Sequence, residues 1–114
     1  MDTKMLVTFR MIVRPERRRD FLETMRGTLE PARVERGCLS YRLYEDAENN
    51  NAFVLLEEWA TQEDLERHIA KDNQRRLLEV MDLLSEQHEF RFNTVSHTAG
   101  MELIGDVLKT DRSG

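Results

Sequence analysis

Only one cysteine, Cys38, occurs in the sequence, so an internal disulfide bond is excluded. A lone thiol is typical of proteins kept in a reducing compartment, and we expect the protein to be cytoplasmic. No apolar stretch is long enough to cross a bilayer, so no membrane span is predicted. The first residues, MDTKMLVTFR, have neither a long apolar segment nor a small-residue cleavage site, which argues against a secretory signal peptide.

Positive charge is scarce relative to negative charge. The 17 Lys and Arg residues are outnumbered by 22 Asp and Glu residues, which gives a formal net charge of -5. A surface without a basic surplus neutralises few phosphates, so nucleic-acid binding is not expected. The three histidines and the cysteine lack the spacing of a metal site, and no glycine-rich phosphate loop or nucleophile elbow is present. No metal and no cofactor are therefore predicted.

What the sequence does contain is enough apolar side chain for one modest core. Its 114 residues are 39% apolar and 34% charged, which suits a single domain. Alternating apolar side chains predict β-strands at residues 5–13, 38–45, 52–59 and 88–95. In the second of these Leu39, Tyr41 and Leu43 share one face, and in the last Phe90 and Phe92 are predicted to face inward. The polar loop between the second and third strands predicts an antiparallel hairpin.

Two regions between these strands have the spacing of helices. Apolar residues predict an amphipathic helix from residue 16 to about residue 35. Pro31 is expected to kink or break this helix near Gly27–Glu30. Thr61, followed by acidic residues, is an N-cap signal for a second region from Gln62 to about Glu86, which forms one bent helix or two consecutive helices.

The order of elements is β-α-β-β-α-β, the ferredoxin-like α+β pattern, in which helices cover one face of an antiparallel sheet. Apolar residues also occur on the other face of the first and third strands, at Leu6, Ile12, Val54 and Leu56. A second copy packed against such a face would form a symmetric homodimer. We assign the domain to residues 4–98. The tail, residues 99–114, is predicted to form a short helix that docks on the domain or on a partner.

Two segments carry a family resemblance, ERGCLSYRLYED at residues 35–46 and FVLLEEWATQEDLERHI at residues 53–69. With the element order, they resemble the antibiotic biosynthesis monooxygenase family, whose members are dimeric α+β barrels. The most specific feature is the E-x-W sequence at Glu57 and Trp59, with His68 nine residues after the tryptophan. The resemblance covers roughly the predicted domain, and it too implies a homodimer.

The resemblance also implies a chemistry. Some members of the family oxygenate phenols or quinols without a cofactor, which requires an apolar cavity, one base and orienting hydrogen bonds. His68 is the candidate catalytic base, because histidine exchanges protons near neutral pH and this helix position faces inward. Trp59, Tyr41 and Asn73 are candidate substrate-binding residues, and Asn73 stands where several members carry a second histidine. A small aromatic molecule is the expected ligand.

Each of these residues also has a purely structural interpretation. His68 could be a core histidine bonded to a strand carbonyl, Trp59 a core anchor, and Tyr41 an ordinary strand tyrosine. The protein would then be a non-catalytic dimeric module that binds ligands or acts under stress. An isomerase for a small hydroxy-ketone, with His68 as proton shuttle, is a third alternative. Haem degradation fits poorly, because Thr8 and Arg10 stand on the first strand, where those members carry an asparagine.

Overall fold

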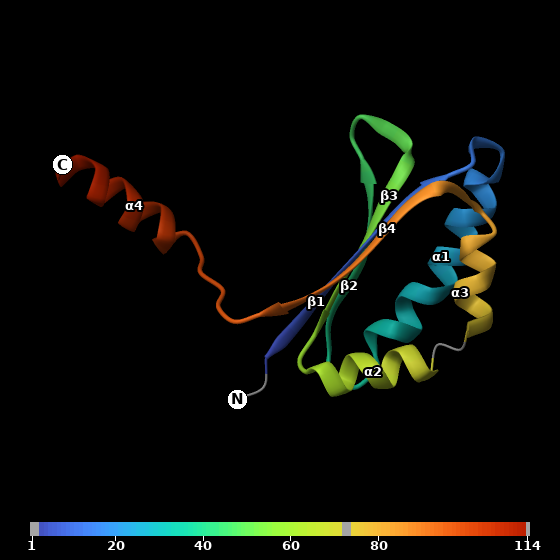
Figure 1. Cartoon of the computed structure of the whole chain (residues 1–114), viewed down its shortest axis with the longest axis horizontal. Helices are drawn as coiled ribbons and strands as arrows, with labels where there is room; N and C mark the ends of the chain where they lie inside the picture. The colour runs from blue at the N-terminus through green and yellow to red at the C-terminus, as the bar shows by residue number, and fades with distance from the viewer. Residues whose placement is uncertain (1–2, 72–73, 114) are drawn as a thin grey trace.

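The computed structural model describes residues 3–71 and 74–113. The elements follow in the order β1 (Lys4–Val13), a short 3-10 helix η1 (Pro15–Arg17), α1 (Arg18–Arg33), β2 (Cys38–Asp46), β3 (Asn49–Trp59), α2 (Gln62–Lys71), α3 (Gln74–Met81), β4 (Leu84–Val95) and α4 (Glu102–Ser113). Figure 1 shows α1, α2 and α3 on the same side of the sheet, with α4 apart from them.

The four strands form one antiparallel sheet in the order β2-β3-β1-β4. β1 pairs with both β3 and β4, so Phe9 lies directly between Leu55 and Phe90. This topology, with helices on one face, confirms the predicted ferredoxin-like α+β fold. β2 and β4 are the edge strands, and residues 86–94 of β4 are exposed.

The core lies between the sheet and the helices because one face of β1 is apolar along its whole length. The alternate residues of that face are all buried, namely Met5, Val7, Phe9, Met11 and Val13. Phe21 of α1 faces them from the helical side and packs on Phe53 of β3, with ring centroids 4.9 Å apart. Burial of each large apolar side chain contributes about 1.5–3 kcal/mol. The sheet therefore fixes where α1 can lie.

Pro31 does not break α1, which was one of the two outcomes expected from the sequence. The helix runs without interruption from Arg18 to Arg33. Pro31 lies in its last turn, so the missing N–H removes only one hydrogen bond near an end that is already short of partners. Buried Ala32 and buried Thr28, whose hydroxyl donates to the Met25 carbonyl at 2.7 Å, hold the turn against the core.

The last strand begins earlier than the sequence indicated. β4 starts at Leu84, whereas the prediction placed helix as far as Glu86 and strand only from residue 88. Leu84 is buried and pairs with Val13, and the Leu83 carbonyl accepts a hydrogen bond from the Arg14 N–H at 3.2 Å. A short apolar run fits a helix and a strand equally well, and here pairing with β1 decides between them.

A bulge at the start of β2 exchanges two side chains between the faces of the sheet. Cys38 pairs with Trp59 and Ser40 pairs with Glu58, so the pairing shifts by one residue between them. The extra residue, Leu39, is 56% exposed, while Cys38 packs against the core. Leu39 therefore does not share the face of Tyr41, contrary to the alternation predicted from the sequence.

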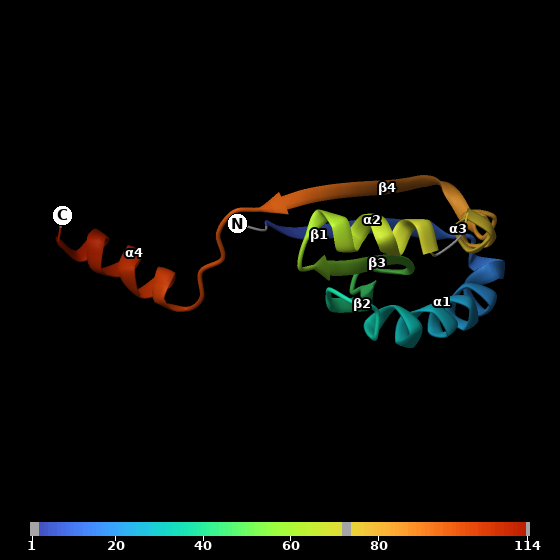
Figure 2. The same cartoon turned by 90° about the horizontal axis from the view of Figure 1, so that it is seen from below.

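α4 lies within the predicted tail and extends away from the sheet and from α1–α3 in both views (Figures 1 and 2). It lengthens the molecule, whose principal extents are 55 × 35 × 22 Å. Within the described ranges, no helix is both long and apolar enough to cross a membrane.

Candidate functional site

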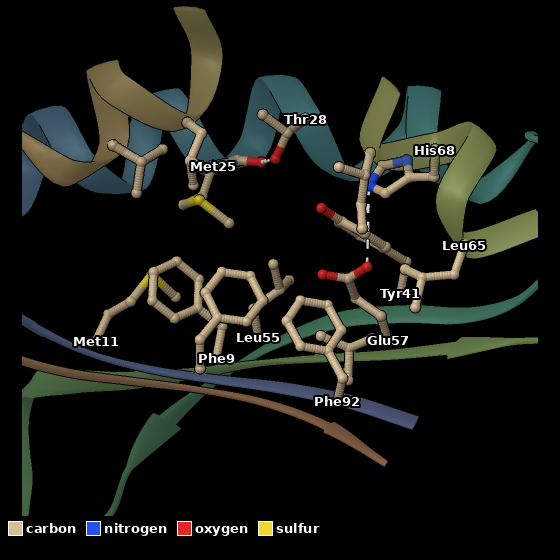
Figure 3. A pocket seen from close by; sticks show the side chains of 15 residues that line it. Phe9, Met11, Met25, Thr28, Tyr41, Leu55, Glu57, Leu65, His68 and Phe92 are labelled. Carbon is tan, nitrogen blue, oxygen red and sulfur yellow. Dashed lines mark hydrogen bonds and ion pairs between the residues drawn. The ribbon is translucent and has the colours of Figure 1, made fainter. Parts of the chain in front are cut away.

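A cavity of about 350 Å³ lies between the sheet and helices α1–α3. Its lining is mostly apolar, and a few polar side chains gather at one part of it (Figure 3). It is lined by Val7, Phe9, Met11, Met25, Thr28, Tyr41, Leu55, Glu57, Leu65, His68, Ile69, Leu77, Val80, Phe90 and Phe92. We call Tyr41, Glu57 and His68 the polar wall. Apolar cavities with a few convergent polar groups are typical sites for small molecules.

The His68 side chain of the polar wall comes from α2 and is held by a carboxylate from another part of the chain. Its Nδ1 atom lies 2.9 Å from Oε2 of Glu35, in the connection between α1 and β2. The two side chains are only 8% and 14% exposed, so water screens their interaction weakly. Because an ionised carboxylate can only accept a hydrogen bond, Nδ1 of a neutral His68 carries the proton. Nε2 is then left with the lone pair.

Glu57 stands on the other side of the same imidazole ring. Its Oε1 atom lies 3.9 Å from Nε2 of His68 and accepts a hydrogen bond from the Trp59 indole N–H at 3.0 Å. Glu57 is 4% exposed, and a carboxylate this deeply buried needs such partners. Two carboxylates therefore flank the ring.

Two aromatic rings fix the orientation of the imidazole. Trp59 stacks on His68 with centroids 4.6 Å apart and an interplanar angle of 28°. Tyr41 meets His68 edge-on, with centroids 5.6 Å apart and an angle of 70°. Tyr41 also pairs directly with Glu57 across the β2–β3 ladder. Figure 3 shows the hydroxyl end of Tyr41 and the carboxylate of Glu57 reaching into the same part of the cavity.

The start of α2 is fixed by a cap, and this cap sets the position of His68. The Thr61 hydroxyl accepts from the Asp64 N–H at 3.0 Å and donates to the Asp64 carboxylate at 2.9 Å, as the cap signal predicted. Hydrogen bonds from Arg67 and then Thr61 hold the pKa of Asp64 below its usual range. Asp64 packs against Gly37, whose φ of 83° and lack of a Cβ permit this approach.

The described residues contain no group of three or more His, Cys, Asp or Glu side chains placed to hold a metal ion. Glu35 and Glu57 lie against opposite nitrogens of His68, so the three groups do not converge on one point. What they can do is hold a proton. His68 can receive one at Nε2 while Glu35 keeps the ring in place.

The comparisons with known proteins agree with this fold. The model of the family described as antibiotic biosynthesis monooxygenase matches residues 5–80, well over half of the chain. The chain belongs to this family. The resemblance inferred from the two sequence segments is thereby confirmed. The uncharacterized protein sll1783 of Synechocystis sp. is 29% identical over 98 residues, which cover 85% of this chain and 67% of that protein.

Solved structures share the fold at lower sequence identity. A conserved protein from Methanosarcina mazei Go1 superposes with a TM-score of 0.78 at 24% identity, over 82% of this chain and 94% of that chain. Rv0793 from Mycobacterium tuberculosis gives a TM-score of 0.74 at 24% identity, over 85% of this chain and 99% of that chain. At these identities the two structures show the fold alone, and the family membership does not specify a substrate.

The structure places the predicted site residues at different depths. Of the four candidates, His68 and Tyr41 line the cavity. Trp59 is fully buried and is not among the described residues that line the cavity, because it lies behind His68 and Glu57. Asn73 lies outside the described residues.

Sequence reasoning gave no role to Glu35. It lies in a polar connection, where glutamate is common, and nothing in the local pattern indicates that it reaches α2. Glu57 had a signal that could have been used. It is the one charged residue on a strand face that otherwise carries Phe53, Leu55 and Trp59, and a charge in that position points to a buried partner.

Cys38 lies near Glu35 and Glu57, but it is not among the described residues that line the cavity. Its pKa is raised, first by burial and then by the negative charges of Glu57 and Glu35. The thiol is therefore neutral at physiological pH, and we assign it no part in the chemistry.

Proposed function

We propose that the protein is a cofactor-independent monooxygenase that acts on a small aromatic quinol or phenol. The observation that supports this most is the polar wall, where a carboxylate-held histidine meets an otherwise apolar cavity. A phenol bound there would place its hydroxyl on His68 and its ring against the apolar lining. Exclusion of water by that lining favours transfer of charge within the cavity rather than to solvent.

The proposed reaction needs only the substrate and dioxygen. His68 takes the phenol proton at Nε2, and the phenolate gives one electron to dioxygen. The resulting phenoxyl radical and superoxide join at a ring carbon that bears hydrogen, forming a C–O bond, and the distal oxygen takes the proton from His68. Loss of the ring C–H proton to His68 then breaks the O–O bond. Hydroxide leaves with that proton as water, so one phenol and one dioxygen give one quinone and one water.

The other residues of the site have supporting roles in this proposal. Glu35 is a positioning residue, because it keeps the proton on Nδ1 and leaves Nε2 free to act as a base. Tyr41 and Glu57 reach the cavity and would orient the substrate oxygen. Trp59 braces His68 by stacking on it and anchors Glu57 through its indole N–H.

An oxygen-electrode screen of quinols and phenols tests the proposal. Supplied with isotopically labelled dioxygen, the protein should consume it and place one labelled atom in the product, with the other appearing in water. An isomerase would give an unlabelled isomer of its substrate and consume no oxygen. A protein that consumes no oxygen across the panel would leave the proposal without support.

A non-catalytic ligand-binding module is the second candidate, and the large apolar share of the lining favours it. Among the described residues that line the cavity, four have polar side chains, namely Thr28, Tyr41, Glu57 and His68. The Thr28 hydroxyl already donates its hydrogen bond to the Met25 carbonyl. Such a module would bind aromatic molecules, as measured by calorimetry, and return them unchanged.

We also propose a homodimer formed through the uncovered face of the sheet. The apolar residues of this face are only partly buried in the single chain, namely Leu6, Ile12, Val54 and Leu56. A second copy would cover them, and the Lys4–Glu58 ion pair of 3.0 Å would lie at the rim of the interface. Light scattering should give twice the 13.5 kDa mass of one chain. A stable species of one chain mass would contradict the dimer.

A further inference from the structure

α4 carries an apolar stripe that no described part of its own chain covers. Leu103, Ile104, Val107 and Leu108 recur along one side of the helix and are each 52–55% exposed. Both views show the helix apart from the sheet and from α1–α3 (Figures 1 and 2). An isolated helix of this length is only marginally stable in water. The stripe therefore indicates that α4 packs against another surface.

The cavity has an apolar opening of the same character. Four of its lining residues are also substantially exposed, namely Ile69 (53%), Leu77 (45%), Phe90 (41%) and Phe92 (52%). We call these four residues the cavity mouth. They lie on α2, α3 and the edge strand β4, where the helical layer does not extend over the sheet. A water-excluding cavity, as the proposed oxygenation requires, needs this mouth to be closed.

We propose that α4 of one copy closes the cavity mouth of a second copy. Every chain that has an uncovered α4 stripe also has an uncovered mouth, so association of two copies satisfies both surfaces without any other partner. The exchange is reciprocal, which makes it compatible with a closed two-fold dimer. Each active cavity would then be completed by the partner subunit.

The connection before α4 favours the second copy over closure within one chain. Residues 96–100 contain no turn and lead the helix away from its own domain (Figure 1). A connection of six residues, 96–101, spans at most about 20 Å. Sheets packed face to face lie about 10 Å apart, which puts the open face of a partner within that reach. The mouth lies on the helical side of the partner's sheet at its β4 edge, so α4 would pass around that edge to cover it. This inference rests on the proposed dimer, and the proposed oxygenation adds only the need to keep water out of the cavity.

Cross-linking between two differently labelled copies tests the exchange. Both chains carry Cys38→Ser. One also carries Leu108→Cys in the stripe, and the other carries Leu77→Cys in the mouth. After co-expression and treatment with a short bis-maleimide, the proposal predicts a covalent product of twice the 13.5 kDa chain mass. Lys109→Cys in place of Leu108→Cys is the matched control, because Lys109 lies on the polar side of α4, and it should cross-link at least several-fold less.

Two results would overturn the exchange. A single chain that carries both cysteines and cross-links only internally would show that α4 covers its own mouth. No cross-link of either kind would show that the stripe does not reach the mouth at all. Light scattering on the same samples keeps the proposals separate, because a dimer without the cross-link overturns only the role of α4.

A fluorescent apolar dye gives a second readout. Ile104→Asp should open the mouth and increase dye binding to the full-length protein, whereas Lys109→Asp should leave it unchanged. Equal dye binding by the two variants would contradict closure of the mouth by α4.

Discussion

The polar wall and the cavity mouth are two sides of one cavity, and they differ in how completely the chain satisfies them. At the polar wall the imidazole is held by Glu35, flanked by Glu57 and stacked on Trp59, and all four side chains are largely buried. At the mouth, apolar side chains such as Phe90 and Phe92 stack on each other with centroids 5.0 Å apart, yet remain about half exposed. The polar wall is buried within a single chain, whereas the cavity mouth is left partly exposed.

The difference fits the roles that the proposed function gives to the two regions. A proton-transfer group must be preorganised, so its contacts come from elements that the fold already fixes. A substrate entrance must open, so its cover is best supplied by a segment that can leave. We therefore expect substitutions at the polar wall to change the chemical step, and substitutions at the mouth to change binding.

Among substitutions that leave His68 itself in place, the largest effect is expected from Glu35→Gln. The amide can donate to Nδ1 of His68, which would move the imidazole proton to Nε2 and remove the base. We expect kcat with a substrate that the wild type turns over to fall by about 10²-fold, with KM little changed. Glu35→Asp should recover part of the loss, and Glu48→Gln, on an exposed turn, should have no effect. A rise in KM alone would contradict a positioning role.

Gly37→Ala should lower the stability of the protein near the polar wall without changing any side chain of that wall. The φ of 83° disfavours any side chain, and a Cβ would overlap the Asp64 carboxylate at the start of α2. Strain of this kind costs about 1–3 kcal/mol of unfolding free energy, measured by urea denaturation. Gly27→Ala is the control, because open space surrounds it within α1, and it should stabilise the protein by about 0.5–1 kcal/mol. Equal effects at the two glycines would refute this explanation.

Phe92→Ala sharpens the comparison from the side of the mouth. In the proposed function the ring would contribute to binding of an aromatic substrate, and it makes no described contact with His68. An aromatic contact is worth about 0.5–1.5 kcal/mol, so KM should rise by roughly 2- to 10-fold with kcat unchanged. Thr94→Ala, an exposed residue two positions further along β4, should change neither constant. A fall in kcat alone would place Phe92 in the chemical step.

The pH dependence of stability in Asp64→Asn tests the hydrogen bonds at the start of α2. The Arg67 and Thr61 hydrogen bonds lower the pKa of Asp64 in the folded protein. The stability they provide is therefore present above the ordinary aspartate pKa and is lost as pH falls through the lower folded value. Urea denaturation should show Asp64→Asn to be less stable than wild type near neutral pH, with the difference shrinking in acid. A difference that is constant with pH would contradict this.

The smallest effect concerns Cys38, beside the polar wall. Its raised pKa, caused first by burial, means that iodoacetamide should react more slowly with the folded protein than with the denatured chain at the same pH. The folded rate should keep rising with pH beyond the usual thiol range. Glu57→Gln should increase the rate modestly, because the charge of Glu57 is the second cause. Equal rates in the folded and denatured protein would show that the thiol is not shielded.

The fold could be predicted because its strongest signals are local. The alternation of apolar side chains in β1 and the N-cap at Thr61 each depend on residues close together in the sequence, and both occur in the structure. The start of β4 and the fate of Leu39 could not be predicted in the same way. Leu84 becomes strand only because Val13 is there to pair with it, and one extra residue in β2 reverses which side chain faces the core.

The candidate site was predictable only in part for the same reason. The inward position of His68 follows from helix periodicity, and Tyr41 follows from strand alternation. The contact between Glu35 and His68 joins residues 33 positions apart through a loop, and no periodic pattern encodes it. Trp59 was predicted to be either a substrate-binding residue or a core anchor, and its depth behind His68 depends on packing that only the assembled fold defines.

Oxygen uptake by His68→Ala tests the central claim most directly. The measurement compares this variant with wild type and with His88→Ala, an exposed histidine of β4, using any phenol or quinol that the wild type oxygenates. Loss of a general base predicts a fall of about 10²- to 10⁴-fold for His68→Ala, partly restored by added imidazole, and little change for His88→Ala. Oxygen consumption by His68→Ala at the wild-type rate would contradict the proposed role of the polar wall.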